Sequence, residues 1–138
     1  MKKSILPLLL VIALLTLSFI ASDYKVTLKN KTVMEKTDSV LRHVVLFKFK
    51  EGTSSADIKK VEEAFSALPS KIPQIISYEW GTNNSPEGLN KGLTHCFFLT
   101  FKSEEDRATY LPHPDHKAFG EVLGPHLDDV TVVDYWTK

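Results

Sequence analysis

A tyrosine and two histidines lie within seven residues of this 138-residue chain, in the segment Tyr110-Leu-Pro-His-Pro-Asp-His116. An imidazole titrates near neutral pH, and a phenol can donate a hydrogen bond to a developing oxyanion. His116 as general base and Tyr110 as oxyanion partner could therefore move a proton next to a carbonyl group. The alternative interpretation is structural: each side chain satisfies a buried backbone group and fixes the local fold.

The two prolines of this segment predict a rigid corner between two short helices. Each proline fixes its own φ and moves the residue before it out of the helical region, so Leu111 and His113 should be extended. A helix that arrives from the preceding charged residues should therefore end near Tyr110. Asp115 should then cap a second short helix.

Two further histidines begin predicted strands. Alternating apolar residues over 42–50 and 93–102 predict strands in which His43 and His95 share a face with phenylalanines, Phe47 among them. Because the first and third strands of the predicted sheet are neighbours, we expect the two histidines to lie side by side at one end of it. The tyrosine and histidines of the corner should converge on the same end.

A metal site is a third interpretation of the corner, because His113 and His116 lie three residues apart. No carboxylate has a ligand spacing with them, so we predict neither a metal ion nor another cofactor. Cys96 is the only cysteine, which excludes an internal disulfide. Its position before two phenylalanines is typical of a small core residue.

The elements that must position these residues follow the order β-α-β-β-α-β. Besides the two strands above, we predict a helix over 56–68, strands over 75–80 and 130–136, and a short helix after Ser103. This order is typical of a ferredoxin-like α+β fold, with helices on one face of an antiparallel sheet. The other face would leave apolar side chains exposed, so we expect two copies to pack sheet against sheet as a homodimer.

The N-terminal residues have the composition of an export signal. Two lysines precede an almost wholly apolar stretch over 5–21, which predicts a secretory signal peptide over 1–22 and an exported, periplasmic or secreted, protein. If this segment stays uncleaved, it would instead anchor the protein, and residues 1–22 would be its only contact with a membrane. Residues 23–41 are predicted to be a polar linker, and residues 42–138 the folded domain.

The charge balance argues against one class of partner. Lys plus Arg and Asp plus Glu both number 17, so the formal net charge is zero. Without a basic stripe, the chain lacks the charge that releases counterions from a phosphate backbone, which argues against binding nucleic acid. The partners that we expect are a second copy of the chain and a small hydrophobic molecule.

Residues 42–135 resemble the stress-responsive dimeric α/β-barrel (Dabb) family. The resemblance rests on four segments: His43-Val-Val-Leu-Phe-Lys-Phe, Trp80-Gly81, Thr94-His95 before a strand, and Tyr110-x-x-His113-Pro114-x-His116 followed by Phe119-Gly120. It implies two ferredoxin-like protomers joined sheet to sheet into a barrel with a cavity. We therefore expect the cavity to lie between the sheets of two copies.

The family includes plant polyketide cyclases similar to olivetolic acid cyclase, which close a linear poly-β-keto thioester by intramolecular aldol condensation. The resemblance implies that Tyr110 and His116 act as the acid–base pair, and that His43 and His95 line or support the cavity. Phe65 stands where those cyclases have a pocket tyrosine, so one polar group is missing. A secretory leader also fits poorly with a coenzyme A thioester, which is made in the cytoplasm.

Three functions follow from these observations. The first is an exported homodimer that binds a small, mostly apolar ligand in a cavity. The second is an enzyme of the cyclase or lyase type, and the third is a structural stress-response protein in which the histidines only brace the fold. The residues expected to edge the cavity are His43, Phe47, Phe65, His95, Tyr110, His113 and His116.

Overall fold

The computed structural model describes residues 39–138. The predicted signal peptide, 1–22, and nearly all of the predicted linker, 23–41, lie outside the described residues. Leu41, the last residue of the predicted linker, is instead the first residue of a strand, and its side chain is buried under the helices. Within residues 39–138, no helix has the length and hydrophobicity needed to cross a membrane.

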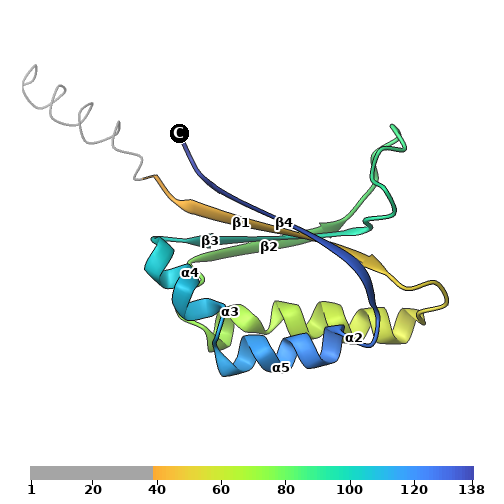
Figure 1. Cartoon of the computed structure of the whole chain (residues 1–138), viewed down its shortest axis with the longest axis horizontal. Coiled ribbons are helices and arrows are strands. Elements are labelled where there is room, and N and C mark those ends of the chain that lie inside the picture. Colours follow the sequence, from red (N-terminus) through yellow and green to blue (C-terminus); the bar gives the residue numbers. More distant parts are fainter. Residues whose placement is uncertain (1–38) are drawn as a thin grey trace, which may run out of the picture. The chain divides into compact units, whose positions relative to one another are not determined.

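The described part of the chain folds as one sheet with helices on one of its faces (Figure 1). The strands are antiparallel and lie in the order β2-β3-β1-β4, which confirms the predicted ferredoxin-like α+β fold. The elements in chain order are β1 (Leu41–Phe49), α2 (Ser55–Ser66), α3 (Leu68–Lys71), β2 (Ser77–Thr82), β3 (His95–Phe101), α4 (Glu104–Tyr110), α5 (Pro114–Leu123) and β4 (Leu127–Trp136).

Helix α2 shows how local sequence sets these boundaries. The hydroxyl of Ser54 accepts a hydrogen bond from the backbone N–H of Asp57 at 3.1 Å and caps the first turn. Val61 and Phe65 lie one turn apart on its buried face. The helix ends at Ser66, and Pro69 then lies in the first turn of the separate short helix α3, where a proline does no harm.

The two faces of the sheet differ because side chains alternate along each strand. In β1, the buried positions face the helices, and they are Leu41, His43, Val45 and Phe47. Stacked rings fill the core beneath them, with Phe65 and Phe97 centred 4.2 Å apart. Burying such a side chain stabilises the fold by about 1.5–3 kcal/mol.

No helix covers the opposite face of the sheet (Figure 1), and this face carries exposed apolar side chains. Val44 of β1 pairs with Phe98 of β3 and with Val133 of β4, so these three side chains form one row. Val133 and Tyr135 are exposed on this face. We call this surface the open face of the sheet.

Candidate functional site

A cavity of about 380 Å³ lies between the sheet and helix α5, inside a single protomer. The expectation that it lies between the sheets of two copies is wrong, because the histidine-bearing face of β1 is the face that the helices cover. The lining residues are His43, Val45, Phe47, Phe65, Tyr110, Leu111, His116, Phe119, Gly120, Leu123, Leu127, Val130, Val132 and Asp134.

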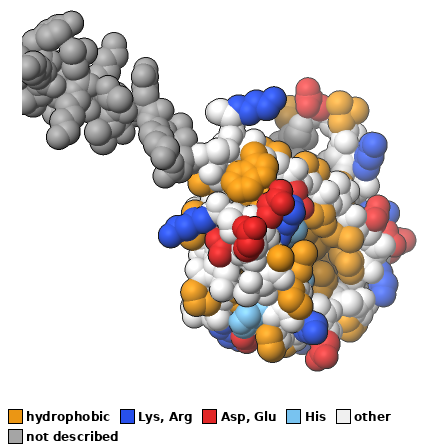
Figure 2. All heavy atoms as spheres, turned by 60° about the vertical axis from the view of Figure 1, so that its left-hand side comes forward, with side chains coloured by type: hydrophobic (Ala, Val, Ile, Leu, Met, Phe, Trp, Pro, Cys, Tyr) orange, Lys and Arg blue, Asp and Glu red, His pale blue; other side chains and the backbone are white. Residues whose placement is uncertain are grey.

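The cavity opens along the edge strand β4. Val130 and Val132 line it and are also exposed, so they form its apolar lip. Leu111, at the end of α4, is a third exposed residue of the lip. On the face drawn in Figure 2, hydrophobic side chains gather around a hollow, with charged side chains at its margins.

Tyr110 brings an unpaired hydroxyl to the cavity wall. It is the last residue of α4, as predicted, and its side chain is 1 % exposed. Its hydroxyl makes no hydrogen bond to residues 39–138, and it is not among the fully enclosed atoms that lack a partner, so the oxygen stays accessible; the side chain lines the cavity. Burial raises the pKa of Tyr110 far above its ordinary value, so the phenol stays protonated and can donate.

His116 lies against Tyr110, with 4.4 Å between the ring centroids. Its Nδ1 lies 2.9 Å from the carbonyl oxygen of Leu111, which can only accept, so Nδ1 carries a proton. In the neutral ring, Nε2 is then the basic atom. Burial lowers the pKa of His116, although the bond to Leu111 acts in the opposite direction, so the ring is neutral near pH 7.

The carbonyl oxygen of Leu111 can accept the hydrogen bond from His116 because Leu111 keeps a helical conformation. Its φ of −58° and ψ of −45° contradict the predicted extended conformation. The N–H of Leu111 donates to the carbonyl of Arg107 at 3.0 Å, and this last bond of the helix outweighs the preference that Pro112 imposes.

His43 forms a second polar group of the cavity together with Asp134, its register partner on β4. Nδ1 of His43 donates to Oδ1 of Asp134 at 2.7 Å, and Oδ2 of Asp134 lies 3.0 Å from Nη1 of Arg107. The rings of His43 and Tyr110 lie 5.8 Å apart. Asp134 is not among the predicted site residues, although it interrupts an apolar series at alternate positions, with Val130 and Val132 before it.

His95 lies at the other end of the sheet, which contradicts the expected pairing with His43. Both histidines begin strands, but β1 and β3 are antiparallel, so His43 pairs with Leu99. Both ring nitrogens of His95 have protein partners, Glu62 at 3.0 Å and Thr94 at 2.8 Å. His95 therefore braces the fold and does not line the cavity of about 380 Å³.

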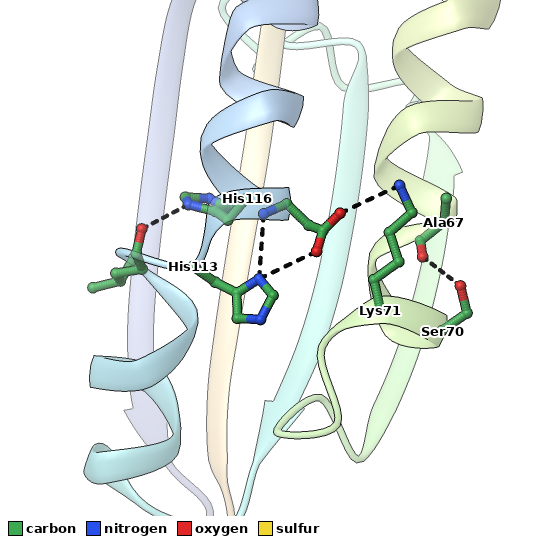
Figure 3. A network of polar contacts seen from close by, with 7 residues as sticks. Ala67, Ser70, Lys71, His113 and His116 are labelled. Atoms are coloured by element: carbon green, nitrogen blue, oxygen red, sulfur yellow. Dashed lines mark hydrogen bonds and ion pairs between the residues drawn. The ribbon is translucent and has the colours of Figure 1, made fainter.

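His113 also lies outside the cavity lining. Nδ1 of His113 accepts from the backbone N–H of Asp115 at 3.3 Å and caps α5, a role that we had predicted for Asp115. The cap falls on His113 because Pro114 occupies the first helical position. Figure 3 shows its ring beside the acid group that pairs with Lys71, while His116 points to the other side of the helix start.

The structure thus brings together five predicted site residues and separates two. Phe47 and Phe65 form the apolar wall, and His43, Tyr110 and His116 form the polar end. His95 lines a separate pocket of about 400 Å³ beside the loop before β3, and His113 caps α5. Arg107 and Asp134 are the additions that the structure makes to the polar end.

Comparison with known proteins gives one family. Residues 41–137 match the model of the stress responsive A/B barrel domain. Stress-response A/B barrel domain-containing protein HS1 of Arabidopsis thaliana is 36% identical over 102 residues, which are 74% of this chain and 94% of that protein. Olivetolic acid cyclase of Cannabis sativa is 27% identical over 95 residues, which are 69% and 94% of the two chains.

A solved structure shows the same fold. It is a dimeric protein of unknown function with a ferredoxin-like fold from Bacteroides fragilis. The two chains are 28% identical with a TM-score of 0.60, over 71% of this chain and 96% of the other.

Proposed function

Because this chain belongs to the stress responsive A/B barrel domain family, we propose that it binds a small, mostly apolar carbonyl compound in the cavity of each protomer. The observation that carries this proposal is the phenol of Tyr110, a buried side chain that lines the cavity and whose hydroxyl makes no hydrogen bond to residues 39–138. A ligand that accepts a hydrogen bond from this phenol gains about 0.5–1.5 kcal/mol.

The distribution of side chains in the cavity defines the ligand further. His43, Tyr110 and His116 gather at one end, whereas Phe47 and Phe65 belong to the apolar wall. A carbonyl oxygen would therefore lie near the phenol, and an alkyl or aryl group would lie against the phenylalanines. The volume of about 380 Å³ is in the range of small-molecule pockets.

Binding of hexanophenone, a ketone with one aryl and one alkyl arm, tests this proposal. We expect Tyr110→Phe to weaken its binding about threefold to tenfold, as the loss of one hydrogen bond of about 1 kcal/mol predicts. Folding stability should hardly change, because phenylalanine keeps the ring and its contacts with Phe101 and His116. Isothermal titration calorimetry measures the first quantity and thermal melting the second.

Tyr78→Phe is the matched control. The hydroxyl of Tyr78 lies 3.0 Å from Oγ of Ser66 and outside the cavity lining, so its removal should lower stability slightly and leave binding unchanged. Equal affinities for the wild type and Tyr110→Phe would contradict the proposal, as would a wild type that does not bind the ketone.

A second candidate function is acid–base catalysis, which the hydrogen bond between His116 and Leu111 favours because it leaves Nε2 basic. In this step, Nε2 of His116 takes the proton from a carbon next to a carbonyl group. The electrons of the broken C–H bond form an enolate, whose oxygen accepts the hydrogen bond of Tyr110. The enolate carbon can then attack a second carbonyl carbon, whose C=O π bond breaks, and the resulting alkoxide takes the proton back from Nε2 of His116, which completes an aldol addition. The similarity to a cyclase supports this reading.

We also propose that two copies pair through the open face of the sheet. Val44, Phe98, Val133 and Tyr135 lie on that face, and pairing would remove their apolar surface from water. The relative from Bacteroides fragilis is a dimer, which supports this proposal. Since the cavity lies on the other side of the sheet, each protomer would keep its own.

A further inference from the structure

We propose that Arg107 is a positioning residue, which holds the carboxylate of Asp134 in the orientation that fixes the imidazole of His43 at the cavity wall. This inference rests on the proposed function, because it concerns the polar end of the same cavity. Its test observes His43 directly and needs neither ligand nor turnover. The two can therefore fail separately.

The two oxygens of Asp134 have different donors. Oδ1 accepts from Nδ1 of His43 at 2.7 Å, and Oδ2 accepts from Nη1 of Arg107 at 3.0 Å. Asp134 is about one-third exposed, with 31% of its side chain accessible, so a carboxylate held only by His43 could rotate and bind water. Two donors on opposite oxygens fix the plane of the carboxylate.

The orientation of Asp134 decides which atom His43 presents to the cavity. A carboxylate only accepts, so Nδ1 of His43 carries the proton and Nε2 keeps its lone pair in the neutral ring. Nε2 has no hydrogen-bond partner in the described part of the chain, and the ring lines the cavity beside Tyr110. The cavity therefore meets an acceptor at His43, and a donor at Tyr110.

Helix α4 carries both Arg107 and Tyr110. Arg107 and Tyr110 are three residues apart and therefore share one face of the helix. One turn earlier, Oε1 of Glu104 accepts from Nε1 of Trp136 at 3.4 Å. The helix thus meets β4 at two points, and the contact of Arg107 is the one that continues to His43.

Arg107 does not line the cavity, so it acts through Asp134 and not on a ligand. The competing interpretation is that its ion pair only fastens α4 to β4. Exposed ion pairs contribute little to stability, and both side chains of this pair are partly exposed. The state of the His43 ring separates the two interpretations.

The experiment compares the ring nitrogens of His43 by NMR in the ¹⁵N-labelled full chain. In the wild type we expect the neutral form of the ring to be a single tautomer with its proton on Nδ1. Arg107→Gln should give a mixture of tautomers and on the order of tenfold faster exchange of the Nδ1 proton with water. Arg107→Lys should restore part of the wild-type signal, because it keeps the charge but not the planar fork. His43→Gln assigns the signals.

Glu104→Gln is the matched control, because it changes the other polar contact of α4 with β4 and should leave the His43 signals unchanged. Wild-type His43 signals in Arg107→Gln would overturn the proposal. Equal changes in Glu104→Gln and Arg107→Gln would also overturn it, since docking of the helix would then be the cause. If Arg107→Gln does not fold, Arg107→Lys takes its place: a tautomer mixture or a faster exchange than in the wild type would support the proposal, and wild-type His43 signals would overturn it.

Discussion

Replacing His116 by alanine should slow α-proton exchange in a bound carbonyl substrate by on the order of 10²- to 10⁴-fold, the usual contribution of a general base. The substrate for this test is a 3-oxo thioester with an alkyl chain, and NMR in deuterated water follows the loss of its C2 proton signal. The effect follows from the hydrogen bond of 2.9 Å to Leu111, which leaves Nε2 of His116 as the basic atom beside the phenol of Tyr110.

The pH dependence of this exchange should identify the base. Burial lowers the pKa of His116 below its ordinary 6.5, so the ring is neutral at pH values well above 6.5. The rate constant of α-proton exchange catalysed by the protein should therefore be constant in this pH range. It should fall only as the pH drops through the lowered pKa of His116. The stability that this group contributes has the same sign: it is full above 6.5 and is lost as the pH falls through the folded-state pKa.

His126→Ala is the control for this prediction, because His126 lies in the turn before β4 and outside the cavity lining. It should exchange the proton as fast as the wild type. An exchange rate in His116→Ala that equals the wild-type rate would contradict the catalytic function. It would leave the binding function to be decided by the ketone experiment.

Introducing an aspartate at Val133 should convert the proposed dimer to monomers at micromolar concentration. Val133 lies on the open face in a row with Val44 and Phe98, where pairing of two sheets would bury the new charge. Breaking an interface with an unpaired buried charge costs several kcal/mol, so we expect the dimer dissociation constant to rise by on the order of a hundredfold or more. Light scattering of the purified protein measures the mass.

Val132→Asp is a matched control on the same strand. Val132 and Val133 are 49% and 48% exposed, but they point to opposite faces of the sheet. Val132→Asp should remain a dimer and bind hexanophenone more weakly, because it places a charge at the cavity lip. A monomeric wild type, or dissociation by Val132→Asp alone, would contradict pairing through the open face.

The sequence predicts the order of elements and much of the site because both depend on local patterns. Alternation along β1 and the helical spacing of Val61 and Phe65 identify the buried faces without tertiary information. The corner between α4 and α5 follows from the conformational limits of proline. These limits also place Tyr110 and His116 one short turn apart, which is why their proximity could be expected.

The remaining features depend on register and on competition between local preferences. The bond of His43 to Asp134 joins residues 91 positions apart, through strand pairing that contains an irregularity after Lys48. His95 lies at the opposite end from His43 because β1 and β3 are antiparallel, so residues that begin the two strands do not meet. Leu111 departs from the preference before proline because a helix hydrogen bond holds it.

The position of the cavity depends on which face of the sheet the helices cover. An apolar strand such as β3 does not reveal this, because His95, Phe97 and Leu99 alternate with Cys96 and Phe98, so both faces are apolar. The structure decides it by burying the first set more deeply than the second. The sequence alone therefore does not distinguish a cavity between the helices and the sheet from a cavity between two sheets.

If the space between α5 and the sheet is an open ligand site, a side chain that fills this space should weaken the binding of hexanophenone. Gly120 lines the cavity on the same helix face as His116 and Leu123, and a Cβ at this position meets no atom within 4 Å. Gly120→Ala, the control, should bind the ketone and melt at a higher temperature, because glycine weakens a helix interior by about 1 kcal/mol.

The measurement is the dissociation constant of hexanophenone for Gly120→Leu by titration calorimetry. We expect Gly120→Leu to fold and to bind hexanophenone on the order of tenfold or more weakly than Gly120→Ala does, since the leucine side chain occupies the place of the alkyl group. A folded Gly120→Leu variant that binds the ketone as tightly as Gly120→Ala would contradict this expectation.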